Sequence, residues 1–139
     1  TYLNGLVLAL ISFRKMKGGN FMGAQKTFAL ILGVVLLLVG ILGFIDNPLV
    51  GDSGLFGTNT WQDVLHLIAG AFGIYVGTKG NGPGFNMTIG WIGIVLGVLG
   101  FIGPIADLFA SLLNINTAIT VLHLAIGVVC LLVYYSASK

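Results

Sequence analysis

Four long apolar stretches dominate the pattern of hydrophobic and polar positions along the chain. They cover residues 27–45, 61–77, 85–102 and 117–135, and each is apolar around its whole circumference rather than on one face. About 20 helical residues cross the hydrocarbon core of a bilayer, whereas a half-buried soluble helix shows an apolar stripe on one side only. The pattern therefore predicts an all-α membrane protein with four transmembrane helices.

The composition places these predicted helices in lipid. The chain has 139 residues, of which 57% are hydrophobic and 7% are charged, whereas about a quarter of the residues of a soluble domain are charged. So few ionisable groups do not cover a surface exposed to water. A single cysteine, Cys130, excludes an intramolecular disulfide and a thiolate metal cluster.

The charged residues separate onto the two ends of the predicted helices. The basic residues precede the first helix, lie in the turn between the second and third, or follow the fourth: Arg14, Lys15, Lys17, Lys26, Lys79 and Lys139. The acidic residues fall at the opposite end: Asp46, Asp52, Asp63 and Asp107. The positive-inside rule then predicts a multi-pass protein of the cell's inner (plasma) membrane with both termini in the cytoplasm. Topology and anionic lipid headgroups account for the basic residues without nucleic acid.

A polar motif occurs twice. "NTWQDVLHLIAG" begins at Asn59 and "NTAITVLHLAIG" begins at Asn116, so the two copies are offset by 57 positions. The same offset, without a gap, aligns Gly33 with Gly90 and Leu55 with Leu112. We interpret the chain as a tandem duplication of two-helix hairpins, residues 22–79 and 80–139. Because each unit has two helices, the repeats must be parallel, and we expect them to pack as a four-helix bundle.

Each copy of the motif predicts a polar stripe along one helix. The residues of the candidate polar layer are spaced by three or four positions: Asn59, Asp63 and His66 in the first copy, and Asn116, Thr120 and His123 in the second. Small residues continue the stripes and favour close helix packing: Gly33, Gly40, Gly43, Gly70, Gly73, Gly90, Gly97, Gly100 and Gly127. Either the asparagines cap the helices or Thr60 and Asp63 form a capping box. We expect the stripes to turn inward and the two histidines to lie at one depth.

The motif resembles the signature of a known family. An Asn-Thr pair followed by Val-Leu-His-Leu and Gly, opening the second and fourth of four short helices, is similar to an uncharacterised bacterial integral-membrane family, a domain of unknown function. The resemblance covers Met22 to about Tyr135. It implies the four-helix architecture and carries no activity with it.

Residues 1–21 call for a separate interpretation. "KGGNFM" is what translation of a ribosome-binding site before a start codon would produce, so we expect natural translation to begin at Met22 and residues 1–21 to be a non-native extension. The apolar run "YLNGLVLALISF" within it is short for a membrane span. If the segment is native, a surface helix with a basic end is the alternative.

The two histidines allow several chemistries. Hydrogen bonds across the bundle are the simplest role for buried imidazoles in a membrane. Axial ligation of haem b by His66 and His123 is the main alternative, with nearby glycines leaving room for the macrocycle. A zinc site has only His66, His123 and Asp63 as ligands, and ion or solute transport by an oligomer would have to work with one polar layer near one face.

No motif of an enzyme is present. The chain lacks a Walker loop, an HExxH helix and a G-x-S-x-G elbow. We therefore expect a non-enzymatic membrane protein with a structural, accessory or binding role. Its expected partners are the lipid bilayer and a membrane protein or a second copy of itself.

Overall fold

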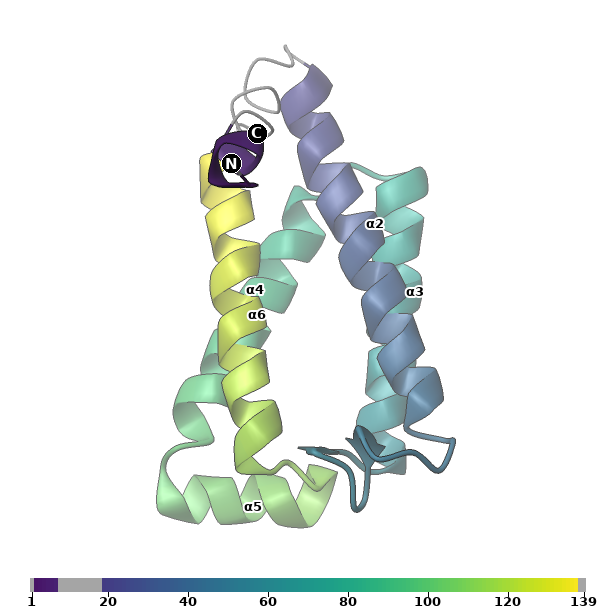
Figure 1. The fold of residues 1–139 in the computed structure, drawn as a ribbon, viewed down its shortest axis with the longest axis vertical. Helices are drawn as coiled ribbons and strands as arrows, with labels where there is room; N and C mark the ends of the chain where they lie inside the picture. Colours follow the sequence, from purple (N-terminus) through teal and green to yellow (C-terminus); the bar gives the residue numbers. More distant parts are fainter. Residues whose placement is uncertain (1, 8–18, 138–139) are drawn as a thin grey trace.

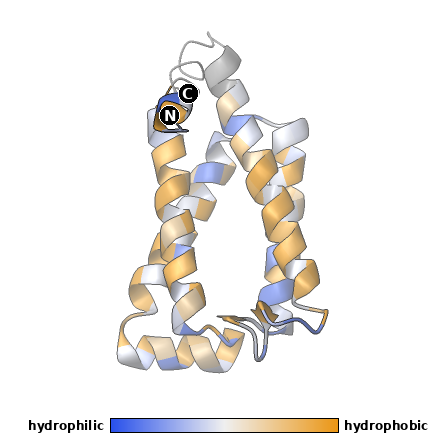
Figure 2. Ribbon diagram, in the orientation of Figure 1, coloured by the Kyte–Doolittle hydropathy of each residue, from blue (hydrophilic) through white to orange (hydrophobic). Residues whose placement is uncertain are grey.

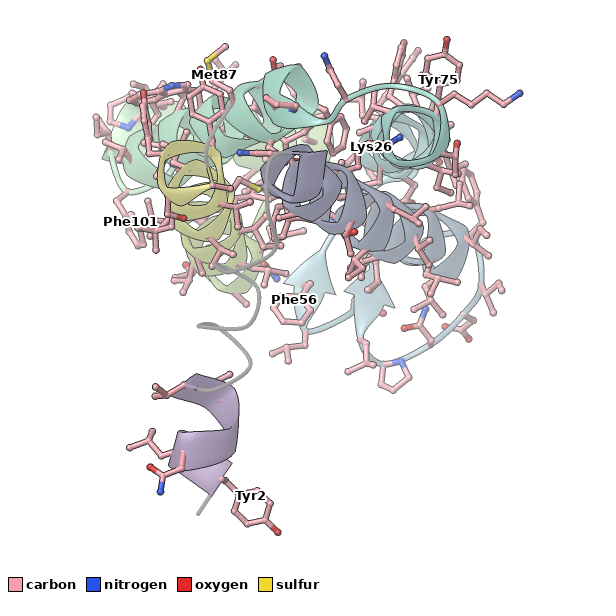
Figure 3. All side chains as sticks on the ribbon, turned by 90° about the horizontal axis from the view of Figure 1, so that it is seen from above. Tyr2, Lys26, Phe56, Tyr75, Met87 and Phe101 are labelled. Atoms are coloured by element: carbon pink, nitrogen blue, oxygen red, sulfur yellow. The ribbon has the colours of Figure 1, made fainter. Side chains whose placement is uncertain are left out.

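The computed structural model describes residues 2–7 and 19–137, which are mostly helical (Figure 1). The elements follow one another as α2 (Gly19–Leu42), β1 (Val50–Gly51), β2 (Phe56–Gly57), α3 (Thr60–Thr78), α4 (Pro83–Leu99), α5 (Gly103–Leu113) and α6 (Thr117–Ser136). Residues 2–7 form a further short helix with exposed side chains, and Tyr2 marks its position apart from the other helices in Figure 3. Residues 8–18, which hold the second half of the apolar run at the start of the chain, lie outside the described residues.

Two hairpins make up the fold. Helix α2 packs along α3, and α4 packs along α6, while contacts between the two pairs are sparse. We call the end that contains residues 79–82 the turn end, and the opposite end, with residues 43–59 and 100–116, the loop end. The hairpins approach each other at the turn end and stand further apart toward the loop end, where α5 and the β1–β2 segment run between them (Figure 1).

Lipid-compatible surface covers the helix shafts. Figure 2 shows hydrophobic residues along the helices and more of the hydrophilic residues near their ends, and Figure 3 shows Tyr75 and Met87 directed outward from α3 and α4. Helices α2 (over Gly23–Leu42) and α6 are long and apolar enough to cross a membrane, and α4 with α5 would make a third, bent span. The helix pairs α2–α3 and α4–α6 fit about four spans.

The predicted limits of the first helix were wrong at both ends. Helix α2 begins at Gly19 and ends at Leu42, not at Ile45. The amide of Asn47 donates to the carbonyl oxygens of Leu42 (2.8 Å) and Ile45 (2.6 Å). Because these carbonyls at the helix end find a side-chain partner, the chain turns three residues earlier than its hydropathy indicates.

The predicted end of the third helix was also wrong, and the sequence analysis did not predict the helix that follows it. Helix α4 ends at Leu99 rather than Ile102, and the chain bends by 119° into α5. Pro104 lies in the first turn of α5. Proline clashes with a preceding helical turn but fits the first turn of a new helix. Residues 103–113, expected to be a connection, therefore form a helix across the loop end.

Backbone contact between glycines holds each hairpin together. A Cβ atom on Gly70 would lie 2.6 Å from the Leu37 nitrogen and 2.8 Å from the Gly33 oxygen. A Cβ atom on Gly127 would meet the nitrogen of Ile94 and the oxygen of Gly90 at the same distances. Each contact in the second hairpin is displaced by 57 positions from one in the first. In lipid, such close approach of backbones is a principal source of helix association.

A buried amide pair joins the hairpins at the turn end. Gln25 on α2 and Asn86 on α4 are fully buried, and the Asn86 amide donates to Gln25 Oε1 at 2.7 Å. Gln25 Nε2 in turn donates to the carbonyl oxygens of Val133, Tyr134 and Ala137 near the end of α6. Three helices from both hairpins are thereby fixed relative to one another. Nothing in the repeated motif predicted this pair.

Candidate functional site

His66 and His123 come together between the hairpins, near the loop end. Each lies about two turns into its helix, after an asparagine that caps the helix. Asn59 Oδ1 accepts from the backbone N–H of Gln62, and Asn116 Oδ1 accepts from the backbone N–H of Ile119, both at 3.0 Å. The two imidazole centroids are 6.2 Å apart, with ring planes at 61°. Equivalent positions of the two motif copies thus supply two neighbouring rings.

The same two asparagines also tie each hairpin to the other. The Asn59 amide donates to the carbonyl oxygen of Leu112 at 2.9 Å, and the Asn116 amide donates to that of Leu55 at 3.0 Å. Leu55 and Leu112 are themselves 57 positions apart, so the two bonds are reciprocal. A single side chain starts its own helix with its oxygen and holds the opposite hairpin with its nitrogen.

Buried polar atoms next to the histidines lack partners. Nδ1 of His66 and Nδ1 of His123 are buried and accept or donate no hydrogen bond among the described residues. Gln62, one turn before His66 on α3, is only 3% exposed. Its Nε2 donates to the carbonyl oxygens of Gly57 (3.1 Å) and Leu113 (2.7 Å), but its Oε1 has no partner. Unpaired buried polar atoms are costly, and three of them gather here.

These three residues line one cavity between the hairpins. Its volume is about 720 Å³, and its wall consists of side chains from α2, α3, α4 and α6 with Leu113 and Ile115 at the loop end. Apart from Gln62, His66, His123 and Thr88, the lining is aliphatic, aromatic or glycine, and no lining residue is charged. Ligand pockets typically enclose about 300–1,000 Å³ with few polar groups. The cavity therefore has the size and the lining of a binding site for an apolar molecule.

The predicted polar stripe divides between two surfaces. His66 and His123 face the cavity, whereas Asp63 and Thr120 face the paired helix of their own hairpin. A Cβ atom on Gly43 would collide with the Asp63 carboxylate, and one on Gly100 would lie 2.6 Å from Thr120 Cγ2. Asp63 is 2% exposed, and its Oδ1 has no hydrogen-bond partner among the residues that the structure describes. The glycine stripes likewise pack within each hairpin rather than turning toward the bundle centre.

A three-ligand zinc site does not form from these residues. Across residues 2–7 and 19–137, no group of three His, Cys, Asp or Glu side chains is placed to hold a metal ion. Asp63 is separated from the histidine pair because its carboxylate lies against Gly43. Cys130 is fully buried and packs near Gly90.

Gln62 is the cavity residue that the sequence analysis missed. Its equivalent in the second copy is Ile119, which also lines the cavity, so the repeat gave no paired signal. The signal that was present is its spacing of four residues before His66, which places both side chains on one helix face. The Gln25–Asn86 pair is not repeated at equivalent positions and was missed for the same reason.

Comparison with known proteins gives a family and no nearer relative. The family model described as Domain of unknown function (DUF4383) matches residues 26–136, which include both hairpins and the histidine pair. No curated protein and no solved structure matches the chain.

Proposed function

We propose that this chain, which belongs to the family Domain of unknown function (DUF4383), is a non-enzymatic membrane protein. We further propose that it binds an apolar small molecule between its two hairpins. The observation that carries the proposal is the cavity of about 720 Å³, with a histidine pair at one end and a lining that is otherwise almost wholly apolar. A space of this size with hydrocarbon walls offers van der Waals contact along its length to an apolar molecule.

The cavity is supported from both ends, which favours a preformed site. The Gln25–Asn86 pair fixes the hairpins at the turn end, and the reciprocal Asn59 and Asn116 bonds fix them at the loop end. Between these two ties the hairpins make few direct contacts. A preformed cavity binds with less loss of conformational entropy than one that must be assembled around its ligand.

Filling the cavity is expected to displace the ligand. Ala69 lines the cavity, whereas Ala71, two residues along the same helix, is exposed. Ala69→Phe should therefore reduce the ligand retained by the purified protein by at least about tenfold, because its ring occupies ligand volume. Ala71→Phe adds the same ring outside the cavity and should leave retention unchanged. Native mass spectrometry after detergent exchange measures the bound mass per chain.

Two outcomes of this experiment would count against the proposal. One is a wild-type chain that carries no adduct even after incubation with a membrane lipid extract. The other is equal retention by Ala69→Phe and Ala71→Phe. Circular dichroism of both variants checks that their helices are retained.

Haem is a second candidate, and the spacing of the rings is the observation in its favour. Two imidazoles on opposite sides of one metal ion, with metal–nitrogen distances of about 2 Å and roughly 1 Å more to each ring centre, have centroids about 6 Å apart, and the observed separation is 6.2 Å. The lining contains no arginine or lysine to hold the propionates. An absorption spectrum of the same purified protein discriminates: a Soret band lost in His66→Ala and in His123→Ala would favour haem over an uncoloured apolar ligand.

Transport by an oligomer, or a purely structural or accessory role, has less support from the site. The histidine pair and Gln62 lie near the loop end, whereas an ion path needs polar groups through the whole bilayer. The tandem origin of the hairpins, which the 57-residue offset of their glycine contacts supports, accounts for the paired histidines as two copies of one ancestral position.

The charge distribution supports an inner (plasma) membrane protein with the turn end in the cytoplasm. Lys26 and Lys79 lie at the turn end, and Asp46, Asp52 and Asp107 lie at the loop end. With Cys130 replaced, a cysteine at the exposed position 52 should react with an impermeant thiol reagent on whole cells, and one at the exposed position 81 should not. The reverse labelling pattern would invert the orientation and place the histidines near the cytoplasmic face.

A further inference from the structure

Helices α3 and α4 are joined by a short turn, residues 79–82, yet they do not pack along each other. Helices with so short a connection are normally antiparallel neighbours. Here α3 packs along α2 and α4 along α6, so α3 and α4 share few direct contacts. They diverge from the turn toward the loop end (Figure 1). Near the turn the ring of Phe85 still reaches α3, because a Cβ atom on Gly73 would lie 2.8 Å from Phe85 Cζ.

The cavity opens sideways between these two diverging helices. Some of its lining residues are also exposed, and they form one stripe on each helix: Leu65, Ile68 and Phe72 on α3, and Gly84, Thr88 and Ile92 on α4. The spacing of three or four positions places the members of each stripe on one helix side. Among the lining residues on α2 and α6, only Val35 is exposed. We call the opening between the two stripes the lateral slot.

The two ends of the cavity are tied by hydrogen bonds, unlike its side. At the loop end, Leu113 and Ile115 line the cavity, and Gln62 Nε2 donates to the Leu113 carbonyl oxygen at 2.7 Å. At the turn end, the Asn86 amide donates to Gln25 Oε1 at 2.7 Å and links α4 to α2. A molecule in the cavity therefore enters most directly through the lateral slot, from the hydrocarbon of the bilayer.

The length of the slot fits a hydrocarbon chain lying along the helices. The lining residues of α3 extend from Gln62 to Val76, which are 14 positions apart and therefore about 21 Å apart along the helix. The hydrocarbon core of a bilayer is about 30 Å thick, so the slot spans more than one leaflet of it. No lining residue is charged.

The charges beyond the two ends of the slot have opposite signs. Lys79 is exposed and follows the lining residue Val76 by one turn at the end of α3. Lys26 lies beside the same turn, since a Cβ atom on Gly82 would lie 2.8 Å from the Lys26 nitrogen. The exposed charged residues of the loop end are acidic: Asp46, Asp52 and Asp107. Basic residues next to a membrane span attract anionic headgroups, and a long lysine side chain reaches the headgroup level.

We propose that the lateral slot binds one acyl chain of an anionic phospholipid whose headgroup lies at the turn end beside Lys79. This inference rests on the proposed binding function. The phosphate stays at the membrane surface, so no polar group of the lipid enters the apolar slot. A headgroup at the loop end would instead meet the acidic residues, and like charges repel each other.

Headgroup selectivity tests the charged part of the proposal. The full chain is placed in nanodiscs of equal parts phosphatidylglycerol and phosphatidylcholine, both with palmitoyl and oleoyl chains, and native mass spectrometry after detergent exchange measures the lipid retained. The wild-type protein is expected to prefer phosphatidylglycerol by at least about fivefold, the effect of one lysine near an anionic headgroup. Lys79→Gln should lower this ratio about fivefold, whereas Asp107→Asn at the loop end should leave it unchanged.

Fluorescence quenching locates the acyl chain. Trp61 and Trp91 are the only tryptophans, so after both are replaced by phenylalanine, Ile126→Trp reports from the α6 wall of the cavity. Phosphatidylglycerol brominated on its oleoyl chain should quench this tryptophan. Ala69→Phe should reduce the quenching because its ring occupies the space of the chain, and Ala71→Phe should not.

The outcomes separate this inference from the binding function. Equal retention of the two lipids, or a ratio that Lys79→Gln leaves unchanged, would overturn the anionic headgroup at the turn end. Quenching that Ala69→Phe leaves unchanged would overturn the acyl chain in the slot, as would a stable dimer whose tryptophan at position 126 is not quenched. If Ala69→Phe still displaced another molecule retained from a lipid extract, the binding function would stand with a different ligand. A protein that retains no molecule from nanodiscs or extract would overturn both.

Discussion

Gly33→Ala is expected to force helices α2 and α3 apart, whereas Gly23→Ala in the same helix is expected to do no harm. A Cβ atom on Gly33 would lie 2.6 Å from the Ile74 nitrogen, 2.7 Å from the Gly73 carbonyl carbon and 2.8 Å from the Gly70 oxygen. All three are backbone atoms and do not move aside as a side chain does. The overpacking should cost about 2–3 kcal/mol of unfolding free energy.

The control position shares the helix and the chemical change. A Cβ atom on Gly23 would meet nothing within 4 Å, so Gly23→Ala should leave the unfolding free energy unchanged or raise it slightly, since alanine favours helix more than glycine does. Unfolding in mixed micelles with increasing sodium dodecyl sulfate, followed by circular dichroism, measures both. Equal stabilities for the two variants would show that backbone contact at Gly33 does not hold the first hairpin.

Replacing both Asn59 and Asn116 is expected to loosen the loop end of the molecule, where the bonds from Gln62 to Leu113 and from Asn114 to Thr58 remain. In the double alanine variant, each helix loses its N-cap, at about 1 kcal/mol, and each hairpin loses the hydrogen bond to the opposite hairpin, at about 0.5–1.5 kcal/mol. The double serine variant keeps an N-capping oxygen but has no amide to reach Leu112 or Leu55. Stability should therefore fall from wild type to double serine to double alanine.

A distance measurement isolates the link between the hairpins from the capping. Spin labels at the exposed positions 60 and 117, the first residues of α3 and α6, should show a longer and broader distance distribution in both double variants, the serine pair included. Labels at 78 and 136 report on the turn end, where the Gln25–Asn86 pair remains, and should show no change. An unchanged distribution at 60 and 117 in the serine variant would show that the bonds from Asn59 and Asn116 do not hold the hairpins together at the loop end.

Much of each hairpin could be predicted because its determinants are local. The apolar runs identified helices α3 and α6 to within one residue at each end, and the asparagines before them are the kind of residue that caps a helix. Asn47, by contrast, ends α2 through bonds to three different carbonyl groups, including that of Val50. Hydropathy does not register such a bond, so the end of this helix was placed too late.

The site was only partly predictable because residues with the same helical spacing face two different surfaces of the hairpin. Residues three and four apart lie on one side of a helix, but that side is wide enough for Asp63 to face Gly43 of its own hairpin and for His66 to face the cavity. The sequence identified both residues as candidates but did not show that they face different surfaces. Gln62 escaped notice because its partner in the repeat is Ile119, so comparison of the copies concealed it.

By itself, the sequence determined the membrane environment, the all-α class, the start of the helices that carry the motif, and His66 and His123 as the residues to examine. These depend on hydropathy and on contacts within one or two helical turns. Only the tertiary structure decided that the histidine rings lie 6.2 Å apart, that Gln62 joins them, and that a cavity of about 720 Å³ separates the hairpins. The distance between the hairpins is set by hydrogen bonds such as Asn59 to Leu112 and Gln25 to Val133, which join residues 53 and 108 positions apart. No local pattern in the sequence predicts such a pairing, because the hydrogen-bonding groups of each partner could be paired equally well in many other arrangements of the chain.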